Sequence, residues 1–189
     1  MTAFDAPAVV AKLLDAANKH RFEESCDANT GALLRLLAAS KPGGRLLNIG
    51  TGVGVSCAWL LDGMSADAEL WTVDIDAERS AVAKTHLDRR LRIVVEDAAQ
   101  FMRGAIGASD GFDLVFADAM PGKYQHLDLA LDLVALGGFY VVDDLIPTED
   151  WSDAATLAPL LIDHVSADRR FTTLRLDWAT GHFLAVRSS

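Results

Sequence analysis

The sequence predicts a doubly wound α/β fold, in which a mainly parallel sheet of about seven strands carries helices on both faces. From residue 45 onward, short apolar runs alternate with amphipathic stretches. The runs LLNI, LVFA and FYVV are apolar on both faces, as central strands of a covered parallel sheet require. The last two runs alternate apolar and polar residues around WATG, which predicts a C-terminal antiparallel hairpin.

Each element follows from this pattern in chain order. Two helices are expected first, over residues 5–20 and 28–39. Strands are then expected over 45–50, 69–75, 91–96, 112–118 and 138–144, and the hairpin over 171–177 and 182–187. The intervening helices are expected over 56–64, 77–87, 97–106, 124–135 and 151–165. No linker divides the chain, so residues 1–189 are expected to form one domain, with helices in 1–40 and the sheet core in 44–189.

Composition excludes several classes of partner. The net charge of −10 argues against nucleic acid, because binding a phosphate backbone requires a basic surface. No apolar run approaches the roughly 20 residues that span a bilayer. Two cysteines give no disulfide framework, so a cytoplasmic protein is expected. The first helix places Val9, Leu13 and Ala17 on one face, which is expected to pack on the core or on a twin subunit in a homodimer.

The turn after the first strand, Gly50-Thr51-Gly52-Val53-Gly54, by itself indicates either a ligand that approaches the backbone closely or a tight strand-to-helix turn without a ligand. Asp74 ends the next strand, 20 residues after Gly54, where a carboxylate accepts ribose hydroxyls. A dinucleotide fingerprint needs a further glycine, but Val55 or Cys57 stands there. The pattern therefore favours a nucleoside cofactor with an amino-acid tail, and an NAD-dependent oxidoreductase is the less supported alternative.

Acids follow every later parallel strand, namely Asp74 and Asp76, Glu96 and Asp97, Asp118, and Asp143 with Asp144. Because ligands bind at the carboxyl ends of strands in such sheets, these acids predict a carboxylate-rich site on one rim. The five histidines share no ligand spacing and are expected at the surface or at helix caps.

The segments LLNIGTGVGVS, TVDID, EDA, FDLVFADAMPGKY and GGFYVVDD resemble the successive motifs of class I S-adenosylmethionine-dependent methyltransferases. More narrowly, they resemble the cation-dependent O-methyltransferases of the catechol and caffeoyl-CoA type, from about Thr30 to the final hairpin. The resemblance implies S-adenosylmethionine as cofactor, a divalent cation (Mg²⁺, Ca²⁺ or Mn²⁺), and a small hydroxylated, catechol-like acceptor.

The resemblance also implies roles for particular residues. The three ligands of the cation would be Asp118, Asp143 and Asp144. Catalytic roles are expected for Asp118, Lys123 and His126. The cofactor would be contacted by Asn48, Gly50, Thr51, Gly52, Gly54, Ser56, Asp74, Ile75, Asp97, Ala98 and Asp118.

Three departures from the family pattern affect the mechanism. Asn48 stands where the strand-one motif commonly has an acid, and Asp144 stands where the third metal ligand is usually asparagine. Pro121 occupies the position of the family's lysine base. Lys123 is expected to point into solvent, because Pro121-Gly122 is expected to turn the chain outward. His126 through a water, or the cation with an aspartate or solvent, is the other route for the proton. A non-catalytic or metal-independent methyltransferase-fold protein stays as the alternative.

Overall fold

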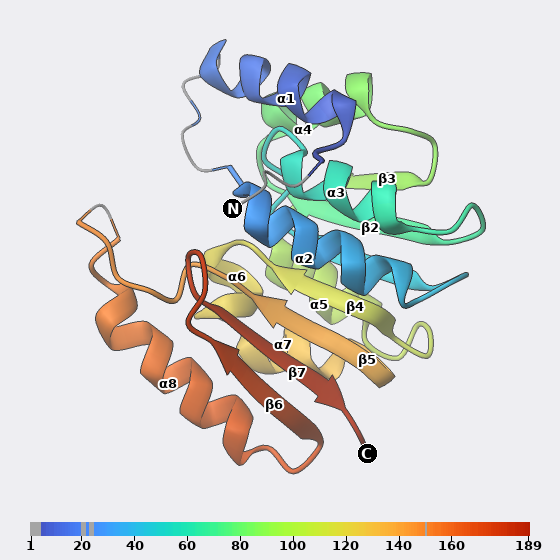
Figure 1. The fold of residues 1–189 in the computed structure, drawn as a ribbon. Coiled ribbons are helices and arrows are strands. Elements are labelled where there is room, and N and C mark those ends of the chain that lie inside the picture. The colour runs from blue at the N-terminus through green and yellow to red at the C-terminus, as the bar shows by residue number, and fades with distance from the viewer. Residues whose placement is uncertain (1–4, 20–21, 23–24, 150) are drawn as a thin grey trace.

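The sheet has seven strands in the order β3-β2-β1-β4-β5-β7-β6 (Figure 1). The computed structural model describes residues 5–19, 22, 25–149 and 151–189. The first five strands pair in parallel, and β7 is antiparallel to both β5 and β6, so the predicted fold class is confirmed. The strands are β1 (Arg45–Ile49), β2 (Glu69–Asp74), β3 (Leu91–Val95), β4 (Phe112–Ala117), β5 (Val134–Val142), β6 (Phe171–Leu176) and β7 (His182–Arg187).

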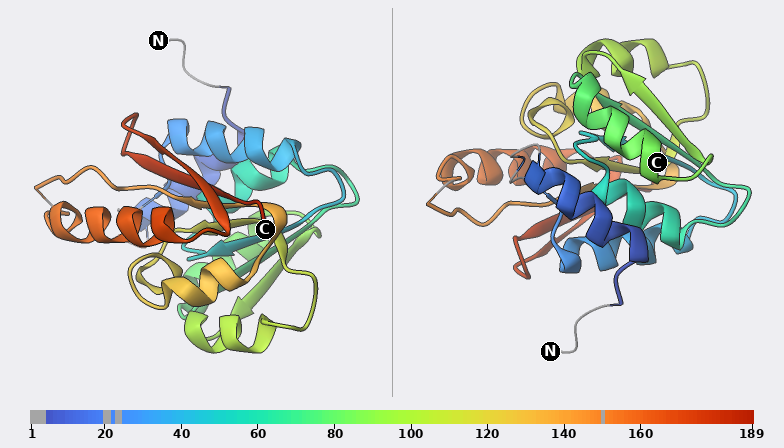
Figure 2. Two further views of the ribbon diagram at one scale, coloured as in Figure 1. Left: turned by 90° about the horizontal axis from the view of Figure 1, so that it is seen from below. Right: turned by 90° about the horizontal axis from the view of Figure 1, so that it is seen from above.

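Helices cover both faces of the sheet (Figure 2). On one face, α2 and α3 pack with Leu34 and Leu60 against Phe116 of β4. On the other face, α5 and α8 place Met102 and Leu161 in a second apolar cluster. The helices are α1 (Ala8–Lys19), α2 (Ala28–Ala39), α3 (Val55–Gly63), α4 (Ala77–His86), α5 (Ala98–Ala105), α6 (Met120–Lys123), α7 (Leu127–Asp132) and α8 (Ala154–Ala167).

Strand register places the acids of the predicted rim side by side. Ile49 of β1 lies opposite Val73 of β2 and Ala117 of β4, and Ala117 lies opposite Val142 of β5. The residues that follow these positions are Gly50, Asp74, Asp118 and Asp143. Parallel pairing therefore delivers the glycine turn and three carboxylates to one edge.

The expected helix over 124–135 is wrong in its extent. The chain forms the short α6, then places His126 in a left-handed conformation at φ 57°, and only then forms α7. A left-handed residue cannot continue a right-handed helix, so the helix begins after it. Strand β5 starts at Val134, earlier than expected, and shifts register against β4 between Phe112 and Leu114.

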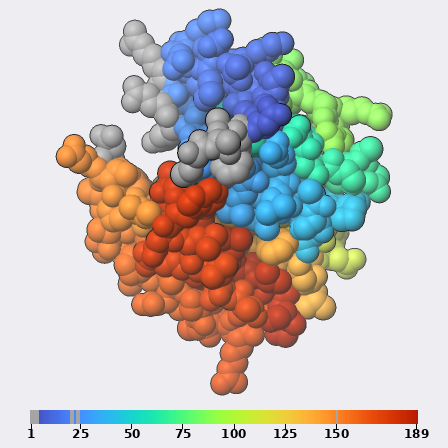
Figure 3. Space-filling model, in the orientation of Figure 1, coloured from blue at the N-terminus to red at the C-terminus, as the bar shows by residue number. Residues whose placement is uncertain are grey.

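The N-terminal helices α1 and α2 pack against the rest of the domain. Helix α1 buries Val10, Leu13 and Ala17 in a cluster that includes Trp59 of α3, so its apolar face packs on the core. The β6–β7 hairpin meets the start of α2 in the surface view (Figure 3). Beneath the surface, the buried Thr30 of α2 and His182 of β7 are hydrogen-bonded. Within the described ranges, no helix is long and apolar enough to cross a membrane.

Candidate active site

The glycine turn is held in place by the carboxylate of Asp74. Its Oδ2 accepts the backbone N–H groups of Thr51 and Gly52, each at 2.8 Å, and its Oδ1 accepts that of Asp76 at 2.9 Å. A carboxylate has about four acceptor positions, so capacity remains for a ligand hydroxyl. Asp74 therefore organises the turn and also lines the cavity above it.

Gly50 occupies a position that only glycine fits. Its φ is +102°, and an added Cβ would lie 2.8 Å from the backbone oxygen of Asp118. The β1 turn therefore touches the end of β4 without a side chain between them. This close approach brings the turn next to the acids of the rim.

Asn48 lies below the turn rather than in contact with the cavity. It is fully buried, and its amide donates to the backbone oxygen of Gly50 at 2.6 Å and to Thr72 Oγ1 at 3.1 Å. Asn48 therefore supports the turn from inside the sheet and does not line the cavity. An amide suits this place because it can donate to a carbonyl oxygen, which a carboxylate cannot.

Asp118, Asp143 and Asp144 converge. One carboxylate oxygen from each residue lies within 4.8 Å of the others. Asp143 is 2% exposed, and its Oδ1 has no hydrogen-bond partner among the described residues. Asp144 has a left-handed backbone at φ 53°, a costly conformation for a residue other than glycine that is characteristic of functional sites. Hard oxygen donors in this number suit Mg²⁺, Ca²⁺ or Mn²⁺.

Burial raises the pKa of Asp143 to about 7, with Lys123 acting against the shift and Asp144 adding to it. Lys123 Nζ lies 3.5 Å from Asp143 Oδ1, which is an ion pair longer than an ordinary hydrogen bond. The expectation of a solvated Lys123 is therefore wrong, since the residue is only 5% exposed.

The geometry of Pro121 and Gly122 explains the position of Lys123. Pro121 has φ −67° and ψ 134°, and Gly122 has φ 85° and ψ −17°, which are the angles of a type II turn. The turn folds the chain back instead of outward, and Tyr140 Oη fixes it by donating to the Gly122 oxygen at 2.7 Å. Lys123 returns to the acid cluster as a result.

A cavity of about 660 Å³ joins the glycine turn to the three aspartates. Sequence reasoning missed much of its wall, because the segment around Phe22–Asp27 has no periodic pattern. An added Cβ on Gly52 would lie 2.8 Å from the Phe22 ring, so this ring rests on the turn. The residues lining the cavity are Phe22, Ser25, Cys26, Asp27, Gly50, Thr51, Gly52, Val53, Val55, Ser56, Asp74, Arg79, Asp118, Ala119, Met120, Lys123, Tyr124, Asp143, Asp144, Ile146, Thr148, Trp151, Ala179 and Thr180.

Several expected contact residues lie outside this wall. Gly54 packs against Ala83 of α4, and Ile75 is 76% exposed. Asp97 is exposed and caps α5 by accepting the Gln100 N–H at 2.9 Å, and Ala98 begins that helix.

Two histidines also differ from expectation. His126 is exposed and lines a hollow separate from the cavity that contains Asp118, so the structure does not bring this candidate catalytic residue into that cavity. His182 is fully buried rather than at the surface, with Nε2 2.8 Å from Thr30 Oγ1 and Nδ1 3.1 Å from the Trp178 oxygen. Burial lowers its pKa. His20 lies outside the described residues.

The strand order, the glycine turn after β1 and the acid at the end of β2 define a class I methyltransferase fold. The chain belongs to the methyltransferase domain family, whose model matches residues 47–145. A Mycobacterium ulcerans relative is 38% identical over 119 residues, which are 59% of this chain and 52% of the relative. The chain thus spans about half the length of the curated relatives it matches first.

Solved structures share the whole fold. A Klebsiella pneumoniae structure is 26% identical, with a TM-score of 0.81, and the match covers 98% of this chain and 92% of that one. It and the Mycobacterium ulcerans relative both carry the name "putative O-methyltransferase". The O-methyltransferase TomG of Streptomyces achromogenes, solved with S-adenosylmethionine, is similar in fold at 22% identity, with a TM-score of 0.82 and coverage of 96% and 90%.

Proposed function

We propose that this chain transfers the methyl group of S-adenosylmethionine to a hydroxyl of a small, catechol-like acceptor, with a divalent cation held by Asp118, Asp143 and Asp144. The observation that carries the proposal is the convergence of these three carboxylates in the cavity that also contains the glycine turn. Family membership and the names of the relatives support methyl transfer to oxygen.

The donor set fits a divalent cation. Asp143 Oδ1 is a buried acceptor without a hydrogen-bond partner in the described part of the chain, and an ion would satisfy it. Three carboxylates carry more charge than the ammonium of Lys123 can balance. A cation bound there supplies Lewis-acid stabilisation of the acceptor's deprotonated hydroxyl.

The chain's own residues would position the cofactor and the acceptor and would surround the acceptor's proton. The turn at Gly50–Gly52 and the carboxylate of Asp74 would hold the cofactor at the edge of β1. Lys123, held by the type II turn, would place its ammonium beside Asp143, and the acceptor's proton would pass to a carboxylate of the cluster or to solvent. Tyr124 and Trp151, whose ring centroids lie 6.2 Å apart, would wall a flat acceptor. Burial raises the pKa of Tyr124 to about 12, so this phenol stays protonated, and its buried hydroxyl, which has no hydrogen-bond partner among the described residues, would be free to donate to the acceptor.

The test is turnover of a catechol panel with labelled S-adenosylmethionine, in EDTA and after adding Mg²⁺ or Mn²⁺. Asp118→Asn and Asp144→Asn should abolish the cation-dependent part. Asp110→Asn is the matched control, because Asp110 is exposed and outside the cavity. Equal turnover by Asp118→Asn and the wild type in both conditions would remove the cation from the proposal.

A metal-independent methyltransferase is the second candidate, and the Lys123–Asp143 ion pair favours it. Here the ammonium itself would stabilise the acceptor's oxygen. This candidate predicts full turnover in EDTA and a loss of about 10²–10³-fold in Lys123→Met.

A further inference from the structure

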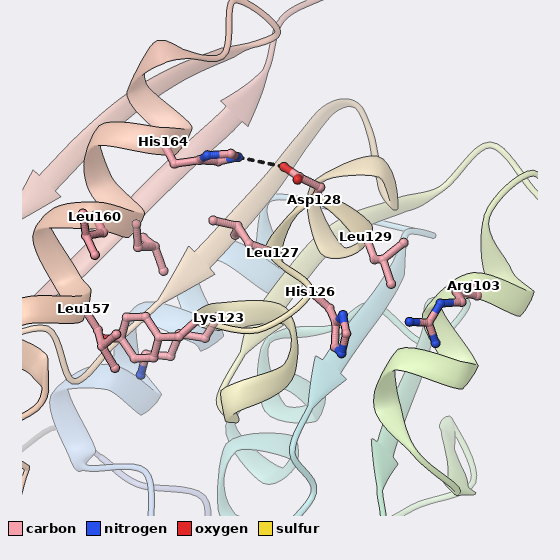
Figure 4. A pocket seen from close by; sticks show the side chains of 11 residues that line it. Arg103, Lys123, His126, Leu127, Asp128, Leu129, Leu157, Leu160 and His164 are labelled. Carbon is pink, nitrogen blue, oxygen red and sulfur yellow. Dashed lines mark hydrogen bonds and ion pairs between the residues drawn. The ribbon is translucent and has the colours of Figure 1, made fainter.

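A second hollow, of about 590 Å³, lies beside the reaction cavity (Figure 4). It runs between α8 and α5 across the segment that leads from α6 into α7. Lys123 and Tyr124 line both cavities, so they form the boundary between them. Its volume is in the range of small-molecule sites.

One end of this hollow carries basic groups that have no partner. The side chains of Arg103 of α5 and of His126 form no hydrogen bond or ion pair with any residue that the structure describes, and Figure 4 shows them next to each other. The other two basic groups are already engaged. Lys123 pairs with Asp143 at 3.5 Å, and His164 contacts Asp128 at 2.7 Å. In a chain of net charge −10, an unpaired guanidinium beside an imidazole is a local attraction for an anion.

The other end is apolar. Leu127 of α7 and Leu157, Leu160 and Leu161 of α8 line it. Leu160 is 63% exposed, so an apolar ligand would remove its side chain from water at a gain of about 25 cal/mol per Å².

Backbone strain fixes the basic end. His126 has φ 57° and ψ 32°, which costs an ordinary residue about 1–2 kcal/mol. With this backbone conformation, the imidazole lies beside Arg103 (Figure 4). Histidine supplies at least one N–H donor at this position in either protonation state.

We propose that this hollow binds a small organic anion with an apolar body. The carboxylate would accept hydrogen bonds from Arg103 and His126, and the body would pack on the α8 leucines. A second copy of this chain fits less well, because it would bring a further net charge of −10 to the same face. The site is separate from the proposed methyl transfer and does not depend on it.

Calorimetry with octanoate tests the proposal. The wild type should bind one octanoate in a saturable manner, and Arg103→Gln should weaken binding at least tenfold, because a charge-assisted hydrogen bond is lost. Arg89→Gln removes the same charge at an exposed position before β3 and should bind as the wild type does. His126→Asn tolerates the left-handed backbone and should also weaken binding.

Two further measurements identify the source of any effect. Leu160→Ser should weaken the binding of octanoate. Methyl octanoate lacks the carboxylate, so it should bind weakly, and with the same affinity, to the wild type and to Arg103→Gln. Unchanged octanoate affinity in folded Arg103→Gln, or no saturable binding to the wild type, would overturn the proposal. A different result would also overturn the proposal: sedimentation could show that the wild type is a dimer that Leu160→Ser dissociates, while octanoate does not bind. The hollow would then be an interface between two copies of the chain.

Discussion

The stability of this protein should fall as the pH rises from 4 to 8 in EDTA, and Asp143 should be the main cause. Its folded pKa of about 7 exceeds the ordinary value of 3.8, because burial disfavours the carboxylate. Between these values the folded state binds a proton that the unfolded state has released, so stability declines with pH and levels off above about 7. The gap between the two pKa values corresponds to about 4 kcal/mol.

Urea unfolding of the wild type and Asp143→Asn at several pH values measures this effect. The free energy of unfolding of the variant relative to the wild type should grow by about 4 kcal/mol from pH 4 to pH 8. The lowered pKa of His182 has the opposite effect, because it makes the free energy of unfolding rise as the pH rises toward 6.5. This contribution is the same in both proteins, so it cancels in the difference between them.

Asp110→Asn, changed at an exposed acid, should follow the wild-type profile. Excess Mg²⁺ should restore stability at pH 8 in the wild type and leave Asp143→Asn unchanged. Parallel pH profiles for the wild type and Asp143→Asn would refute the reasoning, because burial of the charged carboxylate would then carry no cost.

Three other changes have defined outcomes. Asp74→Asn should weaken S-adenosylmethionine binding by about tenfold or more in calorimetry, because one charged acceptor of two backbone N–H groups is lost. Gly50→Ala should cost about 2 kcal/mol or more in urea unfolding, since its φ is +102° and the new Cβ meets the Asp118 oxygen. Thr30→Val should cost about 1–3 kcal/mol, measured by thermal unfolding, because His182 Nε2 loses its buried partner.

The positions of the acids at the strand ends were predictable from the sequence, because they depend on where the apolar runs begin and end. Apolar runs identify the strands, and parallel pairing brings their carboxyl ends to one edge, so Asp118, Asp143 and Asp144 meet as expected. The same holds for Asp74 beside the glycine turn.

The position of Lys123 was not predictable in this way. Pro121-Gly122 does indicate a turn, but the direction of the turn is fixed by Tyr140, 18 residues away in the sequence. His126 was misplaced because its left-handed backbone has no signal in the pattern of helix 124–135. The wall contributed by Phe22 depends on tertiary contacts, with the glycine turn at Gly52 and with the Arg79 guanidinium 4.2 Å from its ring, which no local pattern indicates.

The strand order has a consequence for biosynthesis. A ribosome releases β5 before β7, so the growing sheet presents β5 as an unpaired edge until residues 182–187 emerge. Such an edge is a template for pairing with other chains. The reaction cavity is also incomplete until then, because Ala179 and Thr180 of the hairpin loop form part of its wall. Truncation before Ala179 should therefore leave a chain that both aggregates and lacks a finished site, although most of its sheet has already been made.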